Sequence, residues 1–225
     1  MKSLFRILVI MTFISSCTQD SYEKGEGKYS LMRGDFVDAY VNASKQIVSF
    51  VTDDGDQLPS VAPYSAKWIA KGDTIYRCML YYNKVETERK QYAAEIVSIG
   101  QVPCAKVKRF SEFDKEFRTD PVKFESMWLS KSEKYLNLYF QLKTGETEDT
   151  SAVQQLAFLT DTVMAYPNGF RTHRLLLHHD QNNVPEYYST KAYVSVPIEA
   201  LDADSVSLSV NTYDGLRLKT IPLHR

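Results

Sequence analysis

The strongest structural signal of the chain is the stretch Tyr135-Leu136-Asn137-Leu138-Tyr139-Phe140-Gln141-Leu142. Its aliphatic residues and Phe140 occupy every second position, and polar or tyrosine side chains stand between them. Successive side chains of a β-strand point to opposite faces, so this alternation predicts a strand with one buried face. A buried face needs a covering layer, and the pattern therefore favours a sheet packed on another sheet.

The same period-two alternation recurs toward the C-terminus. It appears as Val206, Leu208 and Val210 between serines, as Leu216 and Leu218 around Arg217 and Lys219, and as Ala192, Val194 and Val196. Six or seven such strands are typical of a β-sandwich, which we place over residues 120–225.

The N-terminal half is also rich in strand signals. We expect barrel strands over 36–41, 47–51, 74–82, 92–99 and 101–110, with a loop-rich crossing over 58–71. Asp53-Asp54-Gly55-Asp56 has the composition of a turn. These features predict a five-stranded, OB-like barrel over residues 34–119.

The boundary between the two halves is predicted at Thr119-Asp120-Pro121, where proline interrupts the pattern. Just before it, residues 111–117 have helical spacing, with Ser111 as a candidate N-cap. The predicted fold class is thus all-β, an N-terminal OB-like small barrel followed by a C-terminal β-sandwich.

The first 16 residues have the features of a signal peptide. Lys2 and Arg6 precede a short apolar run, and the small residues Ser15 and Ser16 stand directly before Cys17. The run is too short to span a bilayer as a helix. Ile14-Ser15-Ser16-Cys17 resembles the lipobox of bacterial lipoproteins, which implies cleavage before Cys17 and attachment of lipid to its thiol.

Residues 17–33 are polar and without apolar periodicity, and we interpret them as a flexible tether from the lipidated Cys17. Several acyl chains together hold a domain durably on a membrane. The expected location is therefore the cell outer membrane, lipid-anchored, with the body either in the periplasm or on the cell surface.

The charge composition of the chain argues against nucleic acid as a partner. The chain has 27 Lys and Arg against 28 Asp and Glu, and removal of the signal peptide takes away two of the basic residues. Proteins that bind nucleic acid carry a basic footprint, which this near-neutral balance lacks.

Two further cysteines, Cys78 and Cys104, follow Cys17. A disulfide between them is chemically permitted outside the cytoplasm, but two cysteines in a chain of this size do not form a framework. Cys78 lies in the middle of a predicted strand, where a free thiol packs as a small apolar group. Both alternatives stay open.

No catalytic or metal-binding constellation stands out. His178 and His179 point to opposite faces of a strand, and His173 lies about 20 Å along it from His179, so the three do not meet on one ion. Hydrolase, nucleotide and dinucleotide motifs are absent. We therefore expect no enzyme activity, no metal and no cofactor.

Tyrosines on the non-core face are the best candidates for a binding surface. Tyr135 and Tyr139 share that face of their strand, and Tyr187 and Tyr188 follow the His-His-Asp turn near His178. Tyrosine combines apolar area with a hydroxyl group, which suits glycans and protein partners. Packing between the domains is the alternative use of these rings.

The second half resembles a known family. Ser126-Met127-Trp128 followed by Tyr135–Phe140, then Leu177-His178-His179-Asp180 and Tyr193-Val194-Ser195-Val196-Pro197, resemble the NigD-like C-terminal domain. The first half is similar to its companion OB domain. The resemblance covers residues 34–223. It implies that the protein is a lipoprotein of Bacteroidetes. The family has no assigned catalytic residues, and its name comes from a bacteriocin gene cluster.

We therefore favour a non-enzymatic binding or accessory module, anchored in the outer membrane, with an envelope protein, peptide or glycan as partner. Two alternatives stay open. One is a hydrolase of envelope polymers that uses His178 or His179 as a base, and it requires a pocket where that imidazole meets a carboxylate. The other is a bacteriocin-associated lipoprotein of immunity type.

Overall fold

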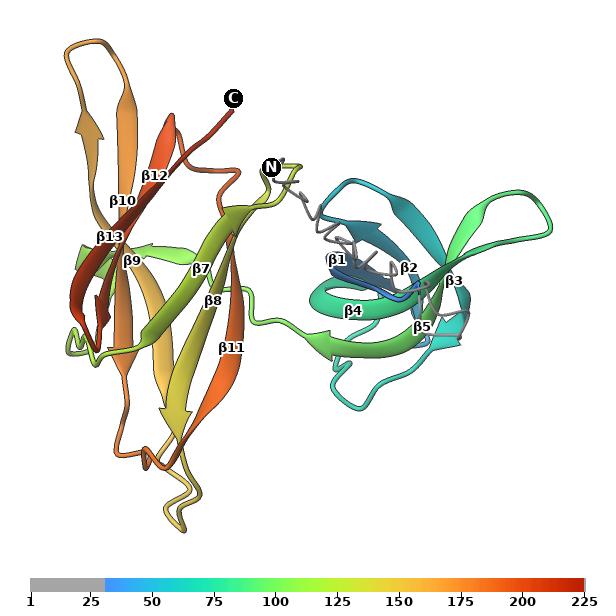
Figure 1. Cartoon of the computed structure of the whole chain (residues 1–225), viewed down its shortest axis with the longest axis horizontal. Helices are drawn as coiled ribbons and strands as arrows, with labels where there is room; N and C mark the ends of the chain where they lie inside the picture. The colour runs from blue at the N-terminus through green and yellow to red at the C-terminus, as the bar shows by residue number, and fades with distance from the viewer. Residues whose placement is uncertain (1–30, 225) are drawn as a thin grey trace, which may run out of the picture.

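The computed structural model describes residues 31–224 of the chain as two β-domains that lie side by side (Figure 1). The predicted signal peptide, Cys17 and almost all of the predicted tether lie outside these residues. Among the residues described, no helix is long and apolar enough to cross a bilayer. The predicted fold class, a small barrel followed by a β-sandwich, is confirmed.

The N-terminal domain is a closed barrel of five strands in the order β1-β2-β3-β5-β4. The strands are β1 (Arg33–Val41), β2 (Ile47–Thr52), β3 (Gln57–Tyr64), β4 (Thr74–Glu86) and β5 (Tyr92–Gln101). β1 pairs with both β2 and β4, and β3 closes the barrel against β5 in parallel. Gly55, with φ +92°, makes the predicted β2–β3 turn, because that backbone conformation suits a residue without Cβ.

The third barrel strand corrects the sequence prediction. β3 occupies Gln57–Tyr64 and overlaps the first half of the segment 58–71, which was expected to be a loop-rich crossing. Pro59 and Pro63 obscure the strand pattern in the sequence, and both are exposed. The strand tolerates them because its pairing with β2 shifts register and its pairing with β5 is limited to one residue pair, so few of its N–H groups are needed.

The C-terminal domain is a β-sandwich of two sheets. The five-stranded sheet has the order β13 (Gly215–Pro222), β12 (Ser205–Thr212), β10 (Arg171–Asp180), β9 (Gln155–Ala165), β6 (Val107–Arg109), and the three-stranded sheet has the order β11 (Tyr188–Pro197), β8 (Tyr135–Thr144), β7 (Lys123–Leu129). Leu136, Leu138 and Phe140 are fully buried between the sheets, as their alternation predicts.

The domain boundary lies near residue 105 and not at the predicted 119–121. The predicted fifth barrel strand, 101–110, is divided: Gln101 ends β5, and Val107–Arg109 form β6, which pairs in parallel with β9 of the sandwich. The predicted helix over 111–117 is reduced to a 3₁₀ turn at Phe110–Glu112. Its spaced phenylalanines serve another purpose, since Phe113 and Phe117 pack against the ring of His178 in β10.

The edge strand β13 also differs from expectation. Leu216 and Leu218 are 75% and 65% exposed, although their alternation with charged residues predicted a buried row. The register explains the difference: the inward-facing Leu208 and Val210 of β12 lie opposite Lys219 and Arg217, which leaves the leucines on the outer face.

Candidate functional sites at the domain junction and on the barrel

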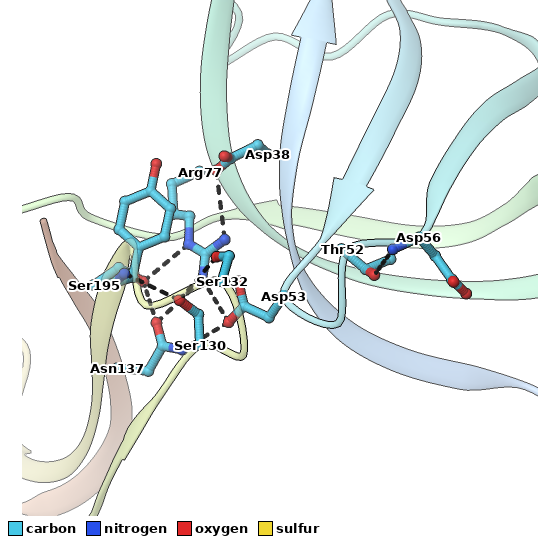
Figure 2. A network of polar contacts seen from close by, with 10 residues as sticks. Asp38, Thr52, Asp53, Asp56, Arg77, Ser130, Ser132, Asn137 and Ser195 are labelled. Atoms are coloured by element: carbon cyan, nitrogen blue, oxygen red, sulfur yellow. Dashed lines mark hydrogen bonds and ion pairs between the residues drawn. The ribbon is translucent and has the colours of Figure 1, made fainter. Parts of the chain in front are cut away.

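A buried polar cluster around Arg77 joins the two domains (Figure 2). The Nη2 atom of Arg77 lies 2.6 and 2.8 Å from the two carboxylate oxygens of Asp53, and Nη1 lies 3.4 Å from Asp38. Across the junction, Arg77 donates to Oδ1 of Asn137 at 3.2 Å and to Oγ of Ser195 at 3.1 Å. One guanidinium therefore contacts four side chains from both domains.

The strand registers place these groups. Asp38 of β1 is the direct cross-strand partner of Arg77 in β4, and Asn137 of β8 is the direct partner of Ser195 in β11. The Ser195 hydroxyl donates to Asn137 Oδ1 at 2.7 Å, and the Asn137 amide donates to Asp53 at 2.7 Å. Each domain thus contributes a pre-paired set of polar groups, and the two sets meet at the guanidinium.

Electrostatics at the cluster reflect burial. Desolvation raises the pKa of the Asp53 carboxyl above its ordinary value, although Arg77 and the Asn137 amide act to lower it. A buried ion pair stabilises a protein little compared with apolar packing, but removal of one partner leaves an uncompensated charge. The guanidinium is thus held by groups of both domains, and loss of any one of them disturbs the junction.

Aromatic side chains complete the junction. Phe36 of β1 meets Trp128 and Tyr193 edge to face at 5.5 and 5.6 Å, and Tyr139 stacks on Tyr193 at 4.8 Å. The Arg77 guanidinium lies 4.1 Å above the ring of Tyr135. Of the predicted binding residues, Tyr135 therefore contacts the barrel across the junction, and Tyr139 stacks on Tyr193 within the sandwich.

The segment between the domains is bonded to both of them. The backbone N–H of Val102 donates to the Arg77 carbonyl at 2.8 Å, on the barrel side. On the sandwich side, Ser195 donates to the Pro103 carbonyl at 3.0 Å and accepts from Ala105 at 2.9 Å. This connection is a short, hydrogen-bonded strap rather than a free linker.

The other predicted binding residues do not share this place. Tyr187 is 79% exposed. Its neighbour Tyr188 pairs with Thr144 at one end of the β8–β11 ladder, and Tyr135 pairs with Pro197 at the other end. Nine residues of strand separate the two ends, which corresponds to about 30 Å. The predicted set of tyrosines and His178 is therefore not one surface, and this grouping was wrong.

His178 and His179 are both buried. His178 Nδ1 accepts the backbone N–H of Arg118 at 3.1 Å, and His179 contacts the Asp120 carbonyl and Gln154 Oε1 at 2.9 and 3.3 Å. Within residues 31–224 neither imidazole forms a hydrogen bond or ion pair with a carboxylate, and no group of three His, Cys, Asp or Glu side chains is arranged to hold a metal. The pocket that the hydrolase hypothesis requires is not at these histidines.

Cys78 and Cys104 are free thiols in the structure, which therefore does not contain a disulfide between them. Cys78 belongs to the barrel core, and burial raises its pKa to about 12. Cys104 lies in the strap and is exposed to solvent.

A groove lies on the barrel, and the sequence analysis did not predict it. Its volume is about 770 Å³, and it runs over β2 and β3 beside the β4–β5 hairpin. The lining consists of Tyr40, Ser49, Phe50, Val51, Asp56, Gln57, Leu58, Pro59, Lys84, Lys90, Gln91 and Tyr92. These residues come from five separate segments of the sequence, so no local motif marks the groove.

A closed five-stranded barrel followed by a two-sheet sandwich defines the class, a two-domain all-β protein. The sequence profile of the NigD-like C-terminal beta sandwich domain matches residues 105–222, more than half of the chain. The chain therefore belongs to the NigD-like family, which confirms the resemblance, and the match begins at the domain boundary seen in the structure.

Solved structures share the whole two-domain fold. A NigD-like immunity protein from Bacteroides caccae is similar with a TM-score of 0.63 and 22% identity, over 83% of this chain and 91% of that one. A protein of unknown function from Bacteroides vulgatus follows with a TM-score of 0.62 and 18% identity, over 86% and 92% of the two chains. A Bacteroides fragilis protein named as a candidate lipoprotein has a TM-score of 0.59 and 11% identity, over 84% and 96%. Comparison with curated proteins finds no match.

Proposed function

We propose that this protein is a lipid-anchored, non-enzymatic binding module of the cell envelope. The observation that carries the proposal is the groove on the barrel, a large hollow lined by exposed tyrosine, amide and hydroxyl groups. Ligand sites are typically hollows of this size with a few polar groups among apolar ones. The lining contains no histidine, cysteine or nucleophile–base pair, so binding is the activity that it supports.

The anchor is the second element of the proposal. Ile14-Ser15-Ser16-Cys17 has the spacing of a lipobox, and a related fold carries the name of a lipoprotein. We expect the Cys17→Ala variant to leave the outer-membrane fraction and lose labelling by a fatty-acid analogue. Unchanged fractionation and labelling of that variant would contradict the anchor.

Orientation at the membrane decides which partners are available. Protease treatment of intact cells, followed by immunoblotting, distinguishes the two cases. Digestion places the domains outside the cell and points to an extracellular partner or glycan, whereas protection until lysis places them in the periplasm.

The binding role is tested by photo-crosslinking in intact cells. A photoreactive amino acid at Gln91, on the rim of the groove, is expected to yield an adduct. The matched control carries the same group at Tyr166, which is exposed on the sandwich. If both positions gave equal adducts, or neither gave one, the groove would not be the binding site.

A second candidate is an immunity-type role, favoured by the name of the Bacteroides caccae protein with the same fold. It predicts that a strain without the gene is more sensitive than its parent to a bacteriocin made by neighbouring bacteria. Equal sensitivity of the deletion strain and its parent would remove this candidate and leave the binding role in place.

A further inference from the structure

The floor of the groove is a row of residues that the barrel register aligns. Tyr40 of β1 is the direct partner of Ser49 of β2, and Ser49 is the direct partner of Pro59 of β3. The neighbouring row pairs Val51 with Gln57. The groove is therefore built on paired strands, which hold its shape without a ligand.

Two tyrosines supply the exposed aromatic area. Tyr40 is 36% exposed on the floor, and Tyr92 is 54% exposed where the β4–β5 hairpin returns into β5. Figure 1 shows that this hairpin projects from the barrel next to β3. An extended ligand along the floor therefore passes both rings.

The charged groups of the lining are largely paired with each other. Lys84 Nζ lies 2.6 Å from Asp56 and 5.1 Å from the centre of the Tyr92 ring. The hydrogen bond from Lys84 lowers the pKa of the Asp56 carboxyl below its ordinary value. The pair fixes the side of the groove and offers hydrogen bonds to a neutral ligand.

We propose that this groove binds a neutral oligosaccharide, the glycan chain of an envelope or extracellular polymer. A sugar ring has an apolar C–H face, which packs on tyrosine, and an edge of hydroxyl groups, which needs donors and acceptors. Tyr40 and Tyr92 match the face, and Ser49, Gln57 and Gln91 match the edge. The inference rests on the proposed binding function and specifies its ligand.

Two other ligand classes fit the lining less well. A nucleic acid strand requires several cations along its phosphates, and here Lys84 is engaged by Asp56, which leaves Lys90 as the other cation of the lining. An apolar peptide requires a predominantly apolar hollow, whereas serine, glutamine and charged side chains make up half of this lining.

The test is affinity electrophoresis of the protein without residues 1–17 in gels that contain starch, mannan, xylan or laminarin. We expect retardation by at least one of these polysaccharides. Tyr92→Ala and Tyr40→Ala are each expected to weaken that binding at least about fivefold, the effect of losing an aromatic contact worth 1 kcal/mol or more. The matched control is Tyr166→Ala, which removes an exposed ring of the sandwich and is expected to bind as the parent does.

The outcomes separate this inference from the proposed function. Retardation by none of the four polysaccharides, retardation insensitive to both tyrosine variants, or preferential binding of a thymidine 30-mer would overturn the oligosaccharide assignment. If the crosslink at residue 91 still captured a protein in cells, the binding function would stand with another ligand. Absence of both the crosslink and the retardation would remove both.

Discussion

The Nε atom of Arg77, in the barrel, donates to the Ser195 hydroxyl of the sandwich at 3.1 Å, across 118 positions of sequence. Both side chains are buried. The contact joins two cross-strand pairs that each domain forms by itself, so the junction depends on the correct fold of both.

Removal of the guanidinium is expected to destabilise the protein strongly. Arg77→Met leaves the buried carboxylate of Asp38 and the half-buried carboxylate of Asp53 without their cation, a change that costs about 3–5 kcal/mol. Urea unfolding followed by tryptophan fluorescence measures the free energy, because Trp68 packs against the barrel core and Trp128 packs at the junction. The control is Arg217→Met, whose exposed pair with Asp214 contributes about 1 kcal/mol or less. Equal losses in the two variants would contradict the role of the cluster.

Acid is expected to weaken the fold through two histidines, the buried His178 and the half-buried His173. Desolvation lowers the pKa of His178 and of His173 below the ordinary imidazole value. The unfolded chain therefore binds protons first, and stability is complete above the unfolded pKa of about 6.5 and declines as the pH falls below it. Each histidine contributes a slope of up to about 1.4 kcal/mol per pH unit.

The double variant His173→Gln and His178→Asn tests this pH dependence, because the side-chain amide introduced by His178→Asn retains an acceptor for the Arg118 N–H. We expect a smaller loss of unfolding free energy between about pH 7 and pH 5 than in the parent. An unchanged slope would show that other groups control the acid response.

The two thiols of the described chain are expected to differ in reactivity. Cys78 is buried in the barrel core with a pKa of about 12, and Cys104 is exposed in the strap with a pKa that partial burial raises. In the protein without residues 1–17, a thiol reagent should titrate one group in the native state, faster at alkaline pH, and two after denaturation. If denaturation without reductant released none, the cysteines would form the disulfide that the sequence leaves open.

Most of the strands could be predicted because their alternation is local. Leu136, Leu138 and Phe140 mark β8 without reference to any other segment, and the barrel strands β1, β2, β4 and β5 follow from similar runs. β3 was not predicted because Pro59 and Pro63 are unusual in a strand. They are tolerated through its loose pairing with β2 and β5, which the local sequence does not reveal.

The candidate sites could not be predicted in the same way. Asp53 has the sequence context of a solvated turn acid, yet it meets Arg77 and Asn137 from distant strands. A signal was present in Asn137, which stands between Tyr135 and Tyr139 on the outer face of β8. An amide between two aromatic residues on a sheet face is consistent with a covered face, and here the barrel covers it.

The outer leucines of β13 provide the last prediction, which separates sequence pattern from register. Leu216 and Leu218 look like core residues in the sequence but lie on the outer face of an edge strand. We expect Leu216→Thr and Leu218→Thr each to change the unfolding free energy by about 0.5 kcal/mol or less, as surface substitutions do. Leu208→Ala, in the adjacent strand and fully buried, should cost about 2–5 kcal/mol. Because both strands belong to the same sheet, chemical denaturation of the three variants compares the unfolding free energy lost at the outer face with that lost at the inner face. A large loss in the threonine variants would mean that another surface covers this side of the sheet.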